Sequence, residues 1–215
     1  MRRFVLSLAL CLSFTASAFA QQKDPIQLFV VDVRGAFGRH KAEPSVATEL
    51  GVEPANLPSR TLGLSGGVHL YPLHLGHVTF GFGGNFVKTR ASESLDVVDA
   101  AGNVTKSPTI RRHFTTFDPE ISLNFGHRSG WSYISGGMFG RSQLFLERAD
   151  DPATDTPYRK TVNYGGGARW FAKTHLAFSL DVRIYAINPG TPYFPPALGS
   201  PRTNLLVIGA GISIK

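Results

Sequence analysis

A histidine, a serine and an aspartate occur at odd-numbered positions of one segment, and hydrolases combine these residue types into a nucleophile, its base and an orienting acid. They are His175, Ser179 and Asp181 in the stretch 175–187, whose apolar alternation predicts a β-strand with all three on one face. A strand rises about 3.3 Å per residue, so His175 would lie about 13 Å from Ser179, beyond hydrogen-bond reach. No inward-facing serine or threonine has a histidine at a cross-strand position that the sequence establishes. We therefore predict no catalytic site.

Seven charged residues occur on the polar faces of predicted strands. Arginine keeps its charge when buried and donates two hydrogen bonds to one carboxylate. An unpaired buried charge is costly, so opposite charges crowded into a narrow interior should pair. We predict a structural network of ion pairs that fills the lumen of a barrel, with a narrow gated ion path as the alternative. The set comprises Asp32, Arg34, Glu120, Arg141, Arg169, Asp181 and Arg183.

The remaining residues with metal-binding or phosphate-binding potential are scattered. Histidines at 40, 69, 74, 77, 113 and 127 lie in separate segments, and their spacing gives no closed metal shell. Glycines at 81–84 and 165–167 precede no predicted helix, so they do not form a phosphate-binding loop and instead relieve crowding in a curved sheet. The sequence thus predicts neither a metal nor a cofactor.

The elements that must position these residues repeat with a period of two, which predicts β-strands. Eight such strands fall within 29–37, 62–71, 78–89, 117–125, 131–147, 161–170, 175–187 and 206–214. Pro119 has no amide to donate and predicts a bulge or weak pairing in the fourth strand. In the fifth, Ile134, Met138, Leu144 and Leu146 are assigned to the apolar face, because the opposite face then collects Ser135, Arg141, Gln143 and Glu147.

The connections between these strands alternate between long and short. The long ones are 39–60, 91–111, 148–159 and 188–202, and the short ones are 73–76, 127–130 and 173–174. This alternation is typical of outer-membrane barrels with long loops outside the cell and short turns in the periplasm. It predicts both termini on the periplasmic side. A turn at 99–104, flanked by strand-like residues, predicts that the third and fourth strands extend outward as a hairpin.

The N-terminus has the features of a secretory signal peptide. Arg2 and Arg3 precede an apolar stretch from Phe4 to Phe14, and small residues then lead to cleavage between Ala20 and Gln21. This divides the chain into a signal peptide, 1–20, and one domain, 21–215. Beyond the signal, no apolar run is long enough for a membrane helix. Cys11 is the only cysteine and leaves with the signal, so the mature chain has no disulfide.

With these strands and connections, the chain resembles the small eight-stranded outer-membrane barrels of the OmpA/OmpX type. Gly209, Ile212 and Ile214 resemble the terminal-strand signal that the outer-membrane assembly machinery reads. The resemblance implies an all-β, up-and-down antiparallel transmembrane β-barrel, monomeric, in the outer membrane of a Gram-negative cell. The formal net charge of +7 suits the anionic lipopolysaccharide of that membrane, whereas nucleic acid is excluded for an exported chain.

Three functional hypotheses follow from the predicted architecture. The first is a structural or surface-interaction barrel with a plugged polar lumen, whose extracellular partner the sequence does not identify. The second is a narrow pore for ions or small solutes. The third is an enzyme that modifies lipid A or phospholipids, and the separation of His175 from Ser179 argues against it.

Overall fold

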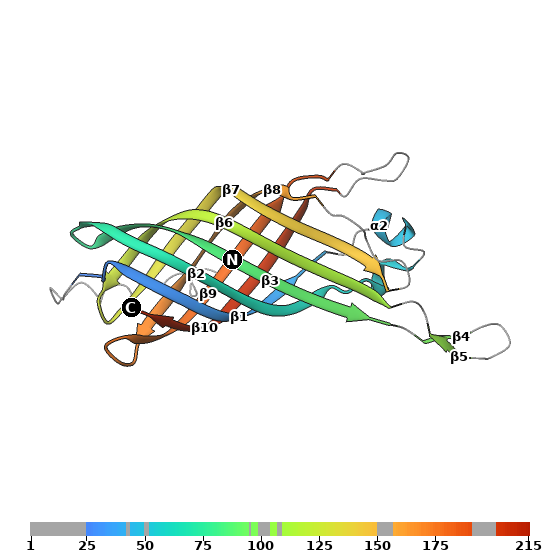
Figure 1. Ribbon diagram of the computed structural model, residues 1–215, viewed down its shortest axis with the longest axis horizontal. Helices are drawn as coiled ribbons and strands as arrows, with labels where there is room; N and C mark the ends of the chain where they lie inside the picture. The colour runs from blue at the N-terminus through green and yellow to red at the C-terminus, as the bar shows by residue number, and fades with distance from the viewer. Residues whose placement is uncertain are drawn as a thin grey trace, which may run out of the picture.

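The computed structural model describes residues 25–41, 44–49, 52–94, 96–98, 104–106, 109–149, 157–190 and 201–215. Within these residues eight antiparallel strands form a closed barrel in the order β1-β10-β9-β8-β7-β6-β3-β2 (Figure 1). The predicted eight-stranded up-and-down barrel is confirmed. Its strands are β1 (Phe29–Arg39), β2 (Arg60–Leu75), β3 (Val78–Glu93), β6 (Ile110–His127), β7 (Gly130–Arg148), β8 (Arg159–Phe171), β9 (Leu176–Ile187) and β10 (Thr203–Ile214).

The two ends of the barrel differ in their connections. At one end, here the turn end, only short links join β2 to β3, β6 to β7 and β8 to β9. At the other, the loop end, β3 and β6 stay paired as far as Glu93 and Ile110, and the small hairpin of β4 (Asp96–Val98) and β5 (Val104–Lys106) lies beyond them (Figure 1). The predicted outward extension is therefore confirmed, although residues 99–103 of the predicted turn lie outside the described residues.

Two short helical segments, α2 (Pro44–Glu49) and η2 (Pro54–Asn56), lie in the connection between β1 and β2. Among the described residues no helix is long and apolar enough to cross a membrane. The predicted signal peptide, 1–20, also lies outside the described residues, as do Ala20 and Gln21, so this part of the sequence stays a prediction.

The outer face of the wall is apolar, and the inner face is mostly polar at mid-height. Along β1 the side chains alternate strictly, with Val31 and Val33 exposed and Asp32 and Arg34 buried. Large apolar side chains project outward all around the barrel, and Ile121 on β6 is 73% exposed. Soluble proteins rarely expose contiguous apolar patches above a few hundred Å². This belt is a surface for lipid, so the barrel spans a bilayer.

Closure of the wall satisfies the backbone inside that bilayer. β1 pairs with β2 on one side and with β10 on the other, from Val31↔Ile214 to Arg39↔Leu206. Hydrocarbon offers no partner to an amide or a carbonyl, so a sheet can span a membrane only when it has no open edge. The first and last strands meet for this reason.

The wall is irregular at two places: the register of β2 with β3 shifts between Leu70 and Leu73, and β7 contains a bulge. Pairing with β6 shifts between Phe117 and Ile121, as the proline in that stretch predicted, and pairing with β8 shifts between Gly137 and Gly140. The extra residue turns two consecutive side chains outward, Met138 at 70% and Phe139 at 78% exposed.

The bulge reverses the predicted faces of the second half of β7. Arg141 is exposed and Leu144 is only 6% exposed, so the prediction that Arg141 lines the lumen and Leu144 faces lipid is wrong. Leu146 likewise packs inward, while Gln143 and Glu147 lie on the side of Arg141. The strict alternation assumed from the sequence fails because one extra residue in a strand moves every later side chain to the opposite face.

The depth of the apolar belt can be tested with one charge at two heights. Leu180→Arg, at mid-height of β9, should lower the free energy of unfolding by about 2–4 kcal/mol, because the guanidinium enters hydrocarbon. Val162 also faces outward, on the neighbouring strand β8, but lies close to the loop end. Val162→Arg should therefore lower the free energy of unfolding by only about 0–1 kcal/mol. Reversible urea unfolding in thin bilayers measures both. Equal costs at the two positions would contradict the assigned membrane span.

Candidate functional site

Six of the seven charged residues predicted for the lumen lie together at mid-height of the barrel. Alternation on β1 turns Asp32 and Arg34 inward, β9 contributes Asp181 and Arg183, and β6 and β8 supply one residue each. Every one of the six is at most 5% exposed. The seventh, Arg141, lies on the outer face beyond the β7 bulge. The six are Asp32, Arg34, Glu120, Arg169, Asp181 and Arg183, and they are here named the lumen network.

One half of the lumen network is built around Asp32. Its carboxylate accepts a hydrogen bond from Arg169 Nε at 3.0 Å and a second from the Nη2 of the same guanidinium. Arg34 Nη2 lies 2.9 Å from Asp32 Oδ1, Ser213 Oγ donates to that oxygen, and His69 Nε2 lies 3.0 Å from Oδ2. Charge-assisted bonds of this kind are stronger than neutral ones, so they hold both guanidiniums in place.

The other half is built around Arg183. Its guanidinium forms an ion pair with Glu120 and a second with Asp181, where Nη2 lies 3.1 Å from Oδ2. The remaining donor positions reach Asn163 Oδ1 at 2.7 Å and Ser135 Oγ at 2.9 Å. Arg183 thus uses its guanidinium to join four strands of the wall.

Two residues that the predicted set omitted join the halves. Tyr133 donates to Asp181 Oδ2 at 2.7 Å and accepts from Arg34 Nη2 at 3.5 Å. His69 has Nδ1 3.4 Å from Glu120 Oε1 while its other nitrogen faces the first half. The sequence held the signal for both, because His69 lies on the predicted inner face of β2 and Tyr133 shares the parity of Ser135 on β7. The network combines three carboxylates with three guanidiniums, so its formal charges balance.

A second polar chain, also missed as a site, runs around the wall toward the loop end. Thr116 donates to Asp118 Oδ2 at 2.7 Å, Ser142 donates to Thr116 at 2.6 Å, and Thr161 donates to Ser142 at 2.8 Å. Asp118 is fully buried. Gly140 makes room for it, because a Cβ at Gly140 would collide with its Oδ1. The bulge therefore accommodates a carboxylate inside a tightly paired wall.

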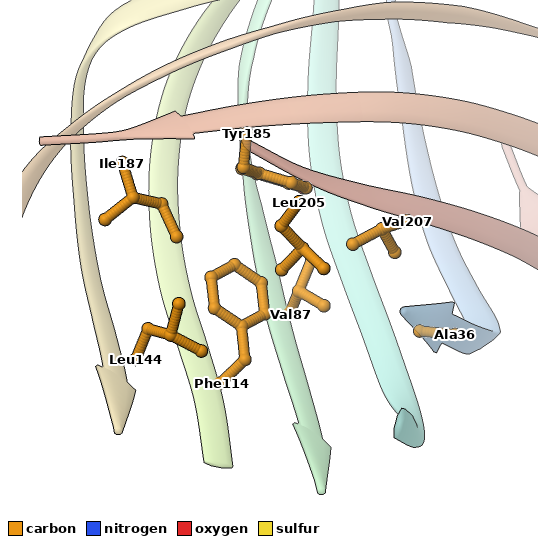
Figure 2. Close-up of a cluster of buried hydrophobic side chains, with 8 residues drawn as sticks. All are labelled: Ala36, Val87, Phe114, Leu144, Tyr185, Ile187, Leu205 and Val207. Carbon is orange, nitrogen blue, oxygen red and sulfur yellow. The ribbon is translucent and has the colours of Figure 1, made fainter. Parts of the chain in front are cut away.

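Apolar layers close the lumen on both sides of the network. Figure 2 shows the layer on the loop side, where side chains from strands around the barrel point toward one another: Ala36, Val87, Phe114, Leu144, Tyr185, Ile187, Leu205 and Val207. On the turn side Ile26, Val30, Tyr71, Trp131 and Tyr133 pack together, with Phe171 against them. A third cluster of Ala47, Leu57 and Ile110 lies at the loop end. The interior is filled with packed side chains.

A histidine–threonine contact that the sequence did not establish lies at the loop end of the lumen. His40 Nε2 lies 3.2 Å from Thr61 Oγ1, which is 2.9 Å from Thr89 Oγ1. Burial, with a contribution from the charge of Arg112, lowers the pKa of His40 to about 3, so the ring is neutral at pH 7. Thr61 is nevertheless 0% exposed. The pair has the geometry of a nucleophile and its base but is sealed from any substrate.

Ser179 of β9 and His175, which directly precedes that strand, do not meet. Ser179 Oγ accepts a hydrogen bond from Arg34 Nε at 3.0 Å, and His175 Nδ1 lies 3.1 Å from the carbonyl oxygen of Lys215. Among the described residues no group of three or more histidine, cysteine or acidic side chains is placed to hold a metal ion.

The closed eight-strand wall, the apolar belt and the filled lumen define the fold of the small eight-stranded outer-membrane barrels. No protein-family model matches the sequence, and no curated protein matches it. Solved structures with this fold include Ail, the attachment invasion locus protein of Yersinia pestis, at 14% identity over 86% of this chain and 97% of that chain, with a TM-score of 0.46. Neisserial surface protein A is similar at 12% identity, 87% and 96% coverage and a TM-score of 0.46. OprG of Pseudomonas aeruginosa is similar at 13% identity over 89% of this chain and 97% of that chain, with a TM-score of 0.44.

The energetic coupling within the lumen network can be measured at one ion pair. Asp32→Ala should lower the free energy of unfolding by about 3–5 kcal/mol, because Arg169 loses a buried partner. Arg169→Met should also lower the free energy of unfolding, because Asp32 then loses its bidentate partner. The double variant should lower it by less than the two single variants combined. Trp131 fluorescence during urea unfolding is a suitable probe, since Arg169 Cζ lies 5.8 Å from the Trp131 ring. Additive costs would mean that the pair is not coupled.

Proposed function

We propose that this chain is a non-enzymatic barrel of a Gram-negative outer membrane that acts through its loop end and not through its lumen. The observation that carries this proposal is the filled interior, in which apolar layers lie on both sides of the lumen network. Small eight-stranded barrels have just enough interior volume for side chains. A structural or surface-interaction role is the one that such a closed body can perform.

The arrangement of the lumen network supports a plug over a pore. A conducting path needs water and mobile or sparsely bonded charges along its length. Here Arg169 donates two hydrogen bonds to one carboxylate, and Arg183 is held by two carboxylates and two neutral acceptors. Bidentate arginine pairs are geometrically specific, which favours a fixed structure over a gate.

The orientation follows from the asymmetry of the connections. We place the loop end outside the cell and the turn end in the periplasm, together with both termini, because outer-membrane barrels have short periplasmic turns and longer extracellular loops. The protruding strands β3 and β6, the β4–β5 hairpin and α2 then form the exposed surface. Within the described chain, this is the surface that is accessible to an extracellular partner.

A conductance measurement tests the plug. Wild-type protein refolded into planar bilayers should give no stepwise ohmic current, because the apolar layers and the lumen network each fill the cross-section of the barrel. A variant with Phe114→Ala and Leu205→Ala removes volume from the apolar layer on the loop side alone and leaves the lumen network in place, so it should remain closed. A porin reconstituted in the same way shows that the assay detects open channels. Reproducible single-channel steps from the wild type would replace the plug with a pore.

A further inference from the structure

Four cations are grouped on the outer face of the barrel, at the loop end of three adjacent strands. Arg39 ends β1, Arg60 begins β2, and Lys88 and Arg90 lie near the end of β3. All four side chains are exposed. They are here named the basic patch.

The register places these like charges beside one another. Arg39 is directly opposite Arg60, and Arg90 is opposite Leu62, which lies two residues from Arg60 on the same face. Neighbouring strands are about 4.8 Å apart, so the patch spans about 10 Å across three strands. Like charges directly opposite one another in a sheet are destabilising. The arrangement therefore calls for an anion between them.

The described part of the chain does not place an anion beside them. None of the four cations forms an ion pair with a described residue. The outward positions of β1, β2 and β3 within their described bounds contain no aspartate or glutamate. The described residues therefore leave the basic patch without a protein countercharge, which makes it a candidate site for an anionic ligand.

The patch lies directly at the edge of the apolar belt, and at one edge only. Each cation-bearing strand has an apolar outward residue two positions nearer mid-height: Phe37 before Arg39, Leu62 after Arg60, and Phe86 before Lys88. At the turn end of the same strands the outward positions are apolar: Phe29, Leu73, Leu75 and Val78. On these three strands the cations therefore match an anionic layer at the loop end and not at the turn end.

We infer that the basic patch binds the phosphates of a lipid A headgroup in the leaflet at the loop end, with the acyl chains against the belt below. Cations at a membrane surface attract anionic headgroups, and a guanidinium can donate two parallel hydrogen bonds to one phosphate. Four cations on adjacent strands suit a headgroup with two phosphates better than one with a single phosphate. The assignment to the outer leaflet rests on the proposed orientation.

A smaller cationic pair repeats the arrangement on the far side of the β7 bulge. Arg141 is directly opposite Lys160 of β8, and both side chains are exposed. The bulge that excludes Arg141 from the lumen thereby places it at the same edge of the belt, where it offers a second contact to the same class of headgroup.

Lipid retention in nanodiscs tests the inference. Three proteins are compared: the wild type, the double variant Arg60→Gln/Arg90→Gln, and the control variant Lys173→Gln. Each is assembled into phosphatidylcholine nanodiscs that also contain lipid A, dephosphorylated lipid A or phosphatidylglycerol. Native mass spectrometry then counts the lipids that stay bound after release from the disc. The double variant should bind lipid A at least about tenfold more weakly than wild type, since each cation near the surface contributes about 1 kcal/mol. Lys173→Gln, which removes a turn-end charge, should match wild type.

The outcomes separate the inference from the proposed function. Equal retention of lipid A by wild type and the double variant, or equal retention of phosphatidylglycerol and lipid A by wild type, would overturn the basic patch as a lipid A site. Heat-dependent migration on SDS gels confirms that each variant is folded. Channel conductance of the wild type would overturn the plug and leave the lipid result standing. Periplasmic exposure of a tag in the 39–60 loop would overturn the orientation and, with it, the assignment of the basic patch to the outer leaflet.

Discussion

Every amide and carbonyl of the wall must find its partner within the chain, because the lipid around the belt offers none. The pairing of β1 with β10 meets this requirement by removing the sheet edges. A barrel of eight strands has a narrow interior, and the period of two then delivers every second side chain into it. Charges such as Asp32 and Arg183 are therefore forced together, and opposite signs in equal number make the crowding tolerable.

The same constraint explains the irregularities of the wall. Large inward side chains such as arginine need room in the narrow interior. Glycine provides that room at several inward positions, because it has no side chain. At Gly167 a Cβ would collide with the carbonyl of Leu180, so only glycine allows the two strands to lie so close. The β7 bulge has a comparable effect, because it admits Asp118 to the wall and turns the following residues. Its consequence on the outside is the placement of Arg141 beside Lys160.

The fold could be predicted from the sequence because its determinants are local. Apolar alternation assigned the faces of seven strands correctly, and Pro119 announced the break in the β6–β7 ladder. The faces beyond Gly137 could not be predicted, since a bulge carries no signal in a period-two pattern. Which charges pair was also hidden, because Asp32 and Arg169 are distant in sequence and meet only across the lumen. The contact of His40 with Thr61 was missed for the same reason, as it depends on how the chain leaves β1.

Closure of the wall between β1 and β10 can be tested by hydrogen exchange at that seam. Backbone amides of residues 31–37 in β1 and 208–212 in β10 should exchange as slowly as those of residues 178–184 in β9, measured by NMR or mass spectrometry on the refolded protein in nanodiscs. Equal protection on both sides of the seam is the predicted result, because an amide paired across β1 and β10 exchanges only when the barrel opens. Rapid exchange confined to β1 and β10, with the other strands protected, would show an open sheet in place of a closed barrel.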